Sequence, residues 1–215
     1  LLTRLGSLCA HLGQFQKALE HHQASLNYGK NDAPGLDLAA NYIGLSQVSD
    51  ILGQLSQAKK YAQHAYDLYA AEEEEDGMVV ALRKMASAAQ GGGQFANAAA
   101  IYRRCLAICR RSSDQLGIAR ANNGLGNALA ELGSYEEARA AYAESLAIYR
   151  KMQDRYSIAL VLCNIGTIDS VLDAQDEARA SYEESYKICA EIGDQAGMGM
   201  ALMNTAVTHE REYNL

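Results

Sequence analysis

The sequence repeats itself with a period of 40 residues, and no insertion or deletion interrupts the register. A signature of leucine, glycine, a polar residue and then an aromatic or apolar residue starts at Leu12 and returns at Leu52 and Leu132. The copy at Gly92 has glycine in the leucine position, and the copy at Leu172 has lost the glycine. A fixed period of this length indicates one small supersecondary unit, stacked many times along a single array.

Two columns of the repeat hold only small residues. Their members are Ala18, Ala58, Ala98, Ala138 and Ala178 in one column, and Gly6, Ser46, Ala86, Gly126, Gly166 and Ala206 in the other. Small residues at matched heights let two antiparallel helices approach closely. One hairpin buries too little apolar surface alone, so neighbouring hairpins must stack. The pattern therefore predicts an all-α solenoid of about five helical hairpins followed by one terminal helix.

Glycine and aspartate mark where these helices end and begin. Each of four first helices is expected to end in a left-handed glycine, at Gly13, Gly53, Gly93 and Gly133. Three aspartates precede first helices and are expected to be N-caps, at Asp114, Asp154 and Asp194. The predicted helices include about 134–152, 155–171 and 195–212, and the predicted repeat units are about 1–34, 35–74, 75–114, 115–154 and 155–194, with the terminal helix in 195–215.

The ends of the sequence fall inside this period. Leu1 lies about six residues into a first helix, and Asn214 and Leu215 match the start of another second helix. We therefore expect residues 1–215 to be one array cut from a longer chain. The polar residues at 208–212 are expected either to cap the array or to lie within its continuation.

The segment from Asn123 to Ala128, continued through Tyr135, Ala138, Tyr142 and Ser145, closely resembles a tetratricopeptide repeat (TPR). The spacing of 40 instead of 34, and the missing repeat-ending proline, make it similar to the repeats of kinesin light chain and of the Leu-Gly-Asn repeat adaptors. The resemblance implies a right-handed superhelix without catalytic activity, which works as a scaffold for protein–protein interaction. A HEAT or armadillo array also has periods of 40 or more, but the constant alanine column and the Leu-Gly turn argue against it.

Composition restricts the partners. The net charge of −7 disfavours contact with a nucleic acid or with an anionic membrane. No stretch is long and apolar enough to be a membrane span. The five cysteines are odd in number and include no CxxC pair, which favours a reducing, cytoplasmic setting.

No group of residues has the spacing of a catalytic, metal or cofactor site, so we expect no enzyme activity, metal or cofactor. His21 and His22 are adjacent and point to different faces of a helix. Cys105 and Cys109 share a helix face, but Cys105 lies in a small-residue column, which favours core packing. The acidic run at 72–76 is placed at the end of a second helix, where it opposes the helix dipole and is either a solvated face or a docking spot for a basic partner.

The remaining candidate is the concave face that the first helices of such arrays present. Aligned on the Leu-Gly turns, the predicted groove residues are Gln47, Arg83, Lys84, Ser87, Arg120, Asn123, Asn127, Asn164, Thr167 and Asn204. Amides pair with a peptide backbone, and arginine pairs with carboxylates. The prediction is a groove that binds an extended peptide or a helix of a partner protein, with a preference for an acidic group. The alternatives are a ligand- or peptide-sensing segment of a bacterial signalling protein, or a face whose polar residues only keep it soluble.

Overall fold

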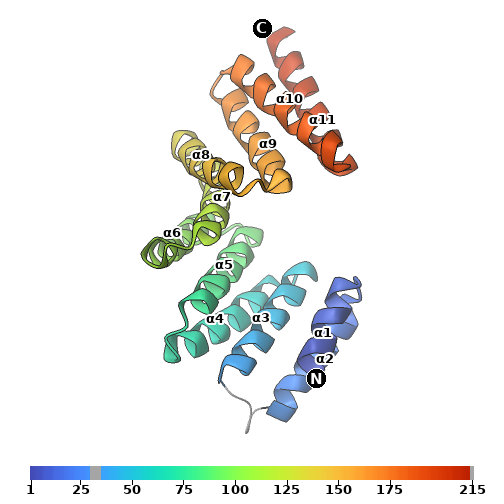
Figure 1. Ribbon diagram of the computed structural model, residues 1–215, viewed down its shortest axis with the longest axis vertical. Coiled ribbons are helices and arrows are strands. Elements are labelled where there is room, and N and C mark those ends of the chain that lie inside the picture. Colours follow the sequence, from blue (N-terminus) through green and yellow to red (C-terminus); the bar gives the residue numbers. More distant parts are fainter. Residues whose placement is uncertain (30–34, 214–215) are drawn as a thin grey trace. The chain divides into compact units, whose positions relative to one another are not determined.

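The computed structural model describes residues 1–29 and 35–213, and for residues 29 and 209–213 it describes the backbone alone. The described chain forms eleven α-helices (Figure 1). It divides into two compact units, unit 1 at Leu1–Ser113 and unit 2 at Asp114–Leu215. We describe each unit by itself.

Unit 1 consists of three helical hairpins. Its helices are α1 (Leu2–His11), α2 (Phe15–Gly29), α3 (Gly35–Ile51), α4 (Leu55–Ala71), α5 (Glu75–Gly91) and α6 (Phe95–Ser112). Each helix packs on the next one, and the first helices α1, α3 and α5 also contact one another in order. The first helices therefore lie together on one side of the unit.

Unit 2 has the same pattern. It consists of two hairpins, followed by one more helix in the first-helix position. Its helices are α7 (Gln115–Glu131), α8 (Tyr135–Met152), α9 (Arg155–Val171), α10 (Gln175–Ile192) and α11 (Gln195–Tyr213). Here α9 contacts both α7 and α11. The predicted all-helical fold of stacked antiparallel hairpins is confirmed, and the predicted limits of α8 and α9 agree with the structure to within one residue.

The turns inside the hairpins follow the glycine prediction. Gly13, Gly53, Gly93 and Gly133 all have φ between 70° and 73°, in the left-handed region where glycine costs least. In the fifth hairpin the same turn is made by Asp173, with a φ of 63°. An aspartate tolerates this conformation better than most residues do, so the turn survives the loss of its glycine.

The predicted N-caps are also confirmed. A side-chain oxygen of Asp114, Asp154 or Asp194 accepts a hydrogen bond from the backbone N–H three residues later, at 2.9–3.1 Å. The prediction for the acidic run at 72–76 holds only in part. Glu72 is the C-cap of α4, where it opposes the helix dipole as predicted. Glu74 is instead the N-cap of α5, and Glu75 and Asp76 lie in its first turn, where negative charge is favourable.

Close contacts between the two helices of a hairpin repeat from copy to copy. The constant alanines at 18, 58, 98, 138 and 178 are all completely buried. Ser145 and Ser185 each donate a hydrogen bond of 2.8 Å to a carbonyl of the preceding first helix. The aromatic rings of Tyr142 and Tyr182 lie against Gly126 and Gly166, where a side chain of any size would collide with them. The small residues at Gly126 and Gly166 are thus required because a second-helix ring packs directly against them.

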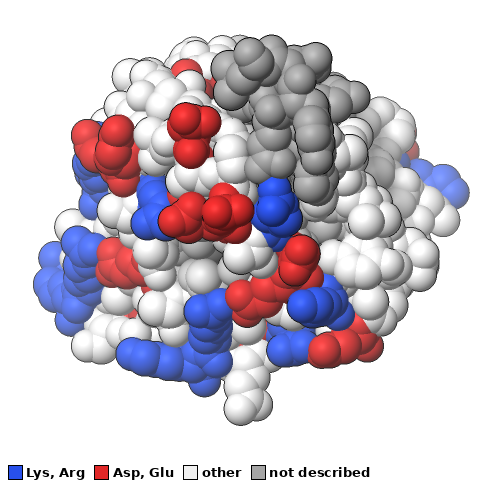
Figure 2. Space-filling view, turned by 90° about the horizontal axis from the view of Figure 1, so that it is seen from above, with Lys and Arg blue, Asp and Glu red and all other residues white. Residues whose placement is uncertain are grey.

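Two expectations concern residues at the end of the chain. Of the polar residues predicted at 208–212, Thr208 is buried and donates to the carbonyl of Asn204 at 2.9 Å. Residues 209–212 and the predicted start of another helix at 214–215 lie outside the residues whose side chains are described. Of the described helices, none has the length and apolar character that crossing a membrane requires. Acidic and basic side chains lie next to one another on the face seen in Figure 2.

Candidate functional site

The predicted groove residues all lie on first helices. Gln47 is on α3, Arg83, Lys84 and Ser87 are on α5, Arg120, Asn123 and Asn127 are on α7, Asn164 and Thr167 are on α9, and Asn204 is on α11. The first four belong to unit 1 and the other six to unit 2. All ten are exposed or half-buried. The one groove predicted for the whole array stays a prediction, and each unit carries its own set of candidate residues.

In unit 2 the structure brings three of these residues together. The side-chain amide of Asn164 on α9 donates to Oδ1 of Asn123 at 3.2 Å and is 3.4 Å from Oδ1 of Asn127, both on α7. We call Asn123, Asn127 and Asn164 the amide cluster. All three side chains are half-buried, so one side of the cluster is accessible to a ligand while its oxygens are already oriented.

A tyrosine of the second helix supports this cluster from below. Tyr142 Oη donates a 2.6 Å hydrogen bond to Oδ1 of Asn127. Burial raises the pKa of Tyr142, so this phenol stays protonated and keeps donating at neutral pH. The neighbouring hairpin repeats the arrangement, since Tyr182 Oη lies 3.4 Å from Oγ1 of Thr167. Thr167 and Asn127 occupy the same column of the repeat.

The remaining unit 2 candidates are Arg120 on α7, Thr167 on α9 and Asn204 on α11. Arg120 is exposed and lies one turn before Asn123 on α7. Thr167 Oγ1 donates to the carbonyl of Cys163 at 3.0 Å, which occupies its hydrogen. Asn204 is half-buried on α11. Among them, Arg120 is therefore the side chain that offers a positive charge to a ligand.

In unit 1 the candidates form a charged group instead. Ser87 Oγ donates to Oδ2 of Asp50 at 3.1 Å, which joins α5 to α3. The pKa of Lys84 is lowered, chiefly by burial and then by the nearby charge of Arg83, while Asp50 acts in the opposite direction. Two cations beside one carboxylate leave excess positive charge at this place. Gln47 is exposed one turn before Asp50.

Some residues that shape these faces were missed by the sequence prediction. Asp50 and the three tyrosines Tyr102, Tyr142 and Tyr182 were not among the candidates. Tyr102 Oη donates to Oε1 of Gln90 at 2.9 Å, and burial raises the pKa of Tyr102 to about 12. A signal was present, because the tyrosines recur at the 40-residue period and face the small-residue column.

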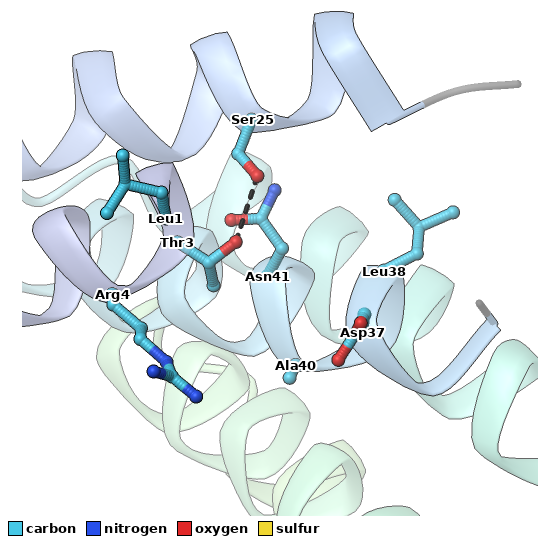
Figure 3. Close-up of a pocket in the computed structure, with 8 residues that line it drawn as sticks. All are labelled: Leu1, Thr3, Arg4, Ser25, Asp37, Leu38, Ala40 and Asn41. Carbon is cyan, nitrogen blue, oxygen red and sulfur yellow. Dashed lines mark hydrogen bonds between the residues drawn. The ribbon is translucent and has the colours of Figure 1, made fainter. Parts of the chain in front are cut away.

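Unit 1 also has a pocket of about 480 Å³ between α1, α2 and α3 (Figure 3). The hydroxyls of Thr3 and Ser25 are hydrogen bonded at 2.9 Å across it, and Arg4 extends away from this pair. Asn41, in the same pocket, is buried and lies 2.7 Å from Nδ1 of His22. Three polar side chains of the pocket, those of Thr3, Ser25 and Asn41, are thus already hydrogen bonded.

The described part of the chain offers no metal site of three or more His, Cys, Asp or Glu side chains. His22 is buried against Gly6 and Gly44, where it takes the place that Tyr142 and Tyr182 have in later hairpins. Cys105 and Cys109 are both fully buried on α6, as the core-packing interpretation of this pair expects. Packing therefore explains His22 and the cysteine pair that stood out in the sequence.

Comparison with solved structures shows the same fold in several proteins. A Rap protein complexed with Competence and Sporulation Factor is 18% identical, with a TM-score of 0.82 over 93% of this chain and 56% of its own. The apo quorum sensor NprR from B. thuringiensis is 15% identical, with a TM-score of 0.81 over 94% of this chain and 57% of its own. The chain thus spans just over half of the length of each. A putative kinesin light chain from Podosopora anserina, with TPR-like repeats, is 18% identical, with a TM-score of 0.73 over 89% of this chain and 94% of its own.

The family comparison is more direct. Among the curated proteins compared with the chain, none matches it. The tetratricopeptide repeat model matches residues 1–71 and 77–151, about two thirds of the sequence. The chain therefore belongs to the tetratricopeptide repeat family.

Proposed function

We propose that the chain is a protein-interaction module that binds an extended peptide, or a helix, of a partner protein on the face formed by its first helices. The amide cluster of Asn123, Asn127 and Asn164 is the observation that carries this proposal. Its three side chains come from two helices, contact one another and remain half-buried, without forming part of the apolar core.

An oriented amide cluster suits an extended peptide because such a peptide has unpaired backbone N–H and C=O groups. A side-chain amide both donates and accepts, so it pairs with either group. Tyr142 and Asn164 already hold Oδ1 of Asn127, which reduces the side-chain entropy lost on binding. A face that was polar only for solubility has no need of this second layer of support.

The cations add a preference for an acidic group in the partner. Arg120 is exposed beside the amide cluster, and its guanidinium is able to bind a carboxylate with two hydrogen bonds. In unit 1, Arg83 and Lys84 repel each other, and a bound carboxylate relieves that repulsion. The favoured ligand is therefore a peptide with an acidic side chain or a free C-terminus.

The proposal also includes three predictions made from the sequence. They are one continuous groove along a single array, a cytoplasmic setting and the absence of catalysis. All five cysteines are free thiols, which agrees with a reducing compartment.

A selection from random peptides tests the proposal. We expect the wild-type chain to enrich peptides that contain Asp or Glu, and Asn123→Ala, Asn127→Ala and Arg120→Ala each to weaken binding of the selected peptide, by fluorescence anisotropy. Asn97→Ala is the matched control, because Asn97 is exposed on the second helix α6. Equal affinity of all four folded variants contradicts the assignment of the site.

A sensing role is the second candidate, favoured by the structural likeness to the quorum sensor NprR and to the Rap protein complexed with Competence and Sporulation Factor. In that role the peptide changes the shape of the array and so controls an attached effector. Small-angle X-ray scattering with and without the selected peptide distinguishes the two. A change in the radius of gyration on binding supports the sensor, and an unchanged value supports a passive scaffold.

A further inference from the structure

A second pocket, in unit 2, lies between α9, α10 and α11 and has a volume of about 260 Å³. Its walls include Leu160 and Cys163 on α9, Cys189 on α10, and Asp194, Gly197 and Met200 at the start of α11. Leu160 and Met200 lie on first helices, and Leu160 is one turn before Asn164 of the amide cluster, on the same face of α9. The pocket thus lies beside the proposed peptide site.

The 40-residue period relates this pocket to a packing contact in unit 1. The column that contains Cys189 holds Tyr69, Cys109 and Tyr149 in the preceding copies. In unit 1 the ring of Tyr69 lies against Gly77, within 2.5 Å of where a Cβ on that glycine would be. In unit 2 the Sγ of Cys189 has the same relation to Gly197, also at 2.5 Å. The two sites have the same geometry, but at Cys189 a thiol takes the place of an aromatic ring.

The acidic residue beside the Tyr69 ring also has an equivalent beside Cys189. Glu74, the N-cap of α5, lies close enough to Tyr69 to raise the pKa of its phenol, after burial as the larger cause. Its equivalent, Asp194, caps α11 through Oδ1, which accepts from the N–H of Gly197 at 3.0 Å. Oδ2 of Asp194 lies 4.0 Å from the Sγ of Cys189, at the edge of the pocket. An acidic N-cap residue thus lies beside this column in both copies, and Oδ2 of Asp194 is an acceptor at the edge of the pocket.

From this correspondence we infer that the pocket receives an aromatic side chain of the bound peptide, a tyrosine in preference to a phenylalanine, which replaces the ring that the repeat lacks at Cys189. The inference rests on the proposed function. The inserted ring packs against Leu160 and Met200, and its hydroxyl donates to Oδ2 of Asp194. Sulfur and aliphatic groups make favourable contacts with aromatic rings.

The thiols in the pocket act as apolar walls. Burial raises the pKa of both Cys163 and Cys189, so both stay protonated at neutral pH and are poor nucleophiles. Cys163 Sγ lies 3.2 Å from Oγ of Ser185, whose own hydrogen is donated to the carbonyl of Ala159. The ligand is therefore held by non-covalent contacts.

The test uses p-cresol, the analogue of a tyrosine side chain, with the 215-residue chain. We expect saturation-transfer NMR to detect p-cresol bound to the wild type, and the methyl signal of Met200 to shift because of the ring current while that of the exposed Met152 does not. Cys189→Tyr restores the ring of the column and fills the cavity, so it should abolish binding and raise the melting temperature. Ala190→Tyr, which adds a phenol at a neighbouring exposed position, should leave p-cresol binding unchanged.

Three results overturn the inference: no p-cresol binding to the wild type, full binding to folded Cys189→Tyr, or equal shifts of Met200 and Met152. If Cys189→Tyr does not fold, the methionine shifts still decide. The pocket and the proposed function fail separately. A selected peptide without aromatic residues that binds tightly overturns the role of the pocket alone, whereas p-cresol binding with no selectable peptide overturns the proposed function alone.

Discussion

Tyr142 Oη on α8 donates a 2.6 Å hydrogen bond to Oδ1 of Asn127 on α7, while the ring of the same tyrosine covers Gly126. One side chain therefore closes the hairpin and orients an amide on the proposed binding face. Both this bond and the contact with Asn164 use Oδ1 of Asn127. Its Nδ2 takes part in neither, so we expect its hydrogens to bind the ligand.

Tyr142→Phe separates these two roles. The ring still fills the space over Gly126, but Asn127 loses its donor, so we expect the free energy of unfolding to fall by about 1 kcal/mol and the affinity for a selected peptide to fall as well. Urea denaturation and fluorescence anisotropy measure the two effects. Tyr28→Phe, at a position 83% exposed, is the control and should change neither.

Gly126→Ala tests the contact between ring and helix. The new Cβ would lie 2.5 Å from the Tyr142 ring, so the ring must move, and we expect a loss of stability of about 1–3 kcal/mol. Gly199→Ala is the opposite case, because the structure shows nothing within 4 Å of that Cβ among the described residues. There the better helix propensity of alanine should raise stability by about 0.5–1 kcal/mol. Equal effects in thermal melts would contradict this packing.

Ala138→Arg tests the register of the repeat. Ala138 is completely buried where α8 crosses α7, so an arginine must either bury a charge or separate the helices, and we expect a loss of several kcal/mol. Ala140→Arg changes an exposed residue of the same helix and should have little effect. A melting curve of Ala138→Arg that overlays the parent would show the column to be misplaced.

His22 makes stability depend on pH. Its Nδ1 donates to Asn41, its Nε2 is buried and has no partner among the described residues, and burial is the main reason that its pKa lies below 6.5. Below pH 6.5 the unfolded chain binds this proton before the folded chain does. Stability should therefore fall as the pH drops from 6.5 toward the lowered pKa, by up to about 1.4 kcal/mol per pH unit.

Urea denaturation between pH 5 and 8 measures this dependence. His22→Gln should flatten the slope whatever its effect on overall stability, and His11→Gln, at an exposed position, should leave the slope as it is. A slope that is the same in the wild type and in His22→Gln would assign the dependence to other groups.

The fold was predictable from the sequence because its determinants are local and recur at 40 residues. A left-handed glycine such as Gly133 and a cap such as Asp154 each act within a few residues of their own position, so the sequence contains everything they need. Features that break the period were not predictable. Asp169 stands in a column with Ala89 and Leu129, yet it is buried and paired with Arg139 at 2.5 Å.

The candidate site was predictable only in part. Its residues could be assigned to first helices from the period alone, but the contact of Asn164 with Asn123 depends on the distance between two helices and on the rotamers of both residues. Support from Tyr142 and the cavity beside Cys189 depend on tertiary packing in the same way. The sequence contained one signal for these tertiary contacts. The tyrosines of the second helices recur at the same period as the glycines of the first helices against which they pack.

Two ion pairs join the start of a first helix to the end of its second helix, at the same columns but with reversed charges. Glu75 on α5 binds Arg111 on α6, whereas Arg155 on α9 binds Glu191 on α10. A second helix exchanged between these hairpins would place Glu75 against Glu191 and Arg155 against Arg111. Each exposed pair contributes little to stability, but together they make the two hairpins electrostatically distinguishable. Recombination within the array would therefore have to change both partners of a pair together.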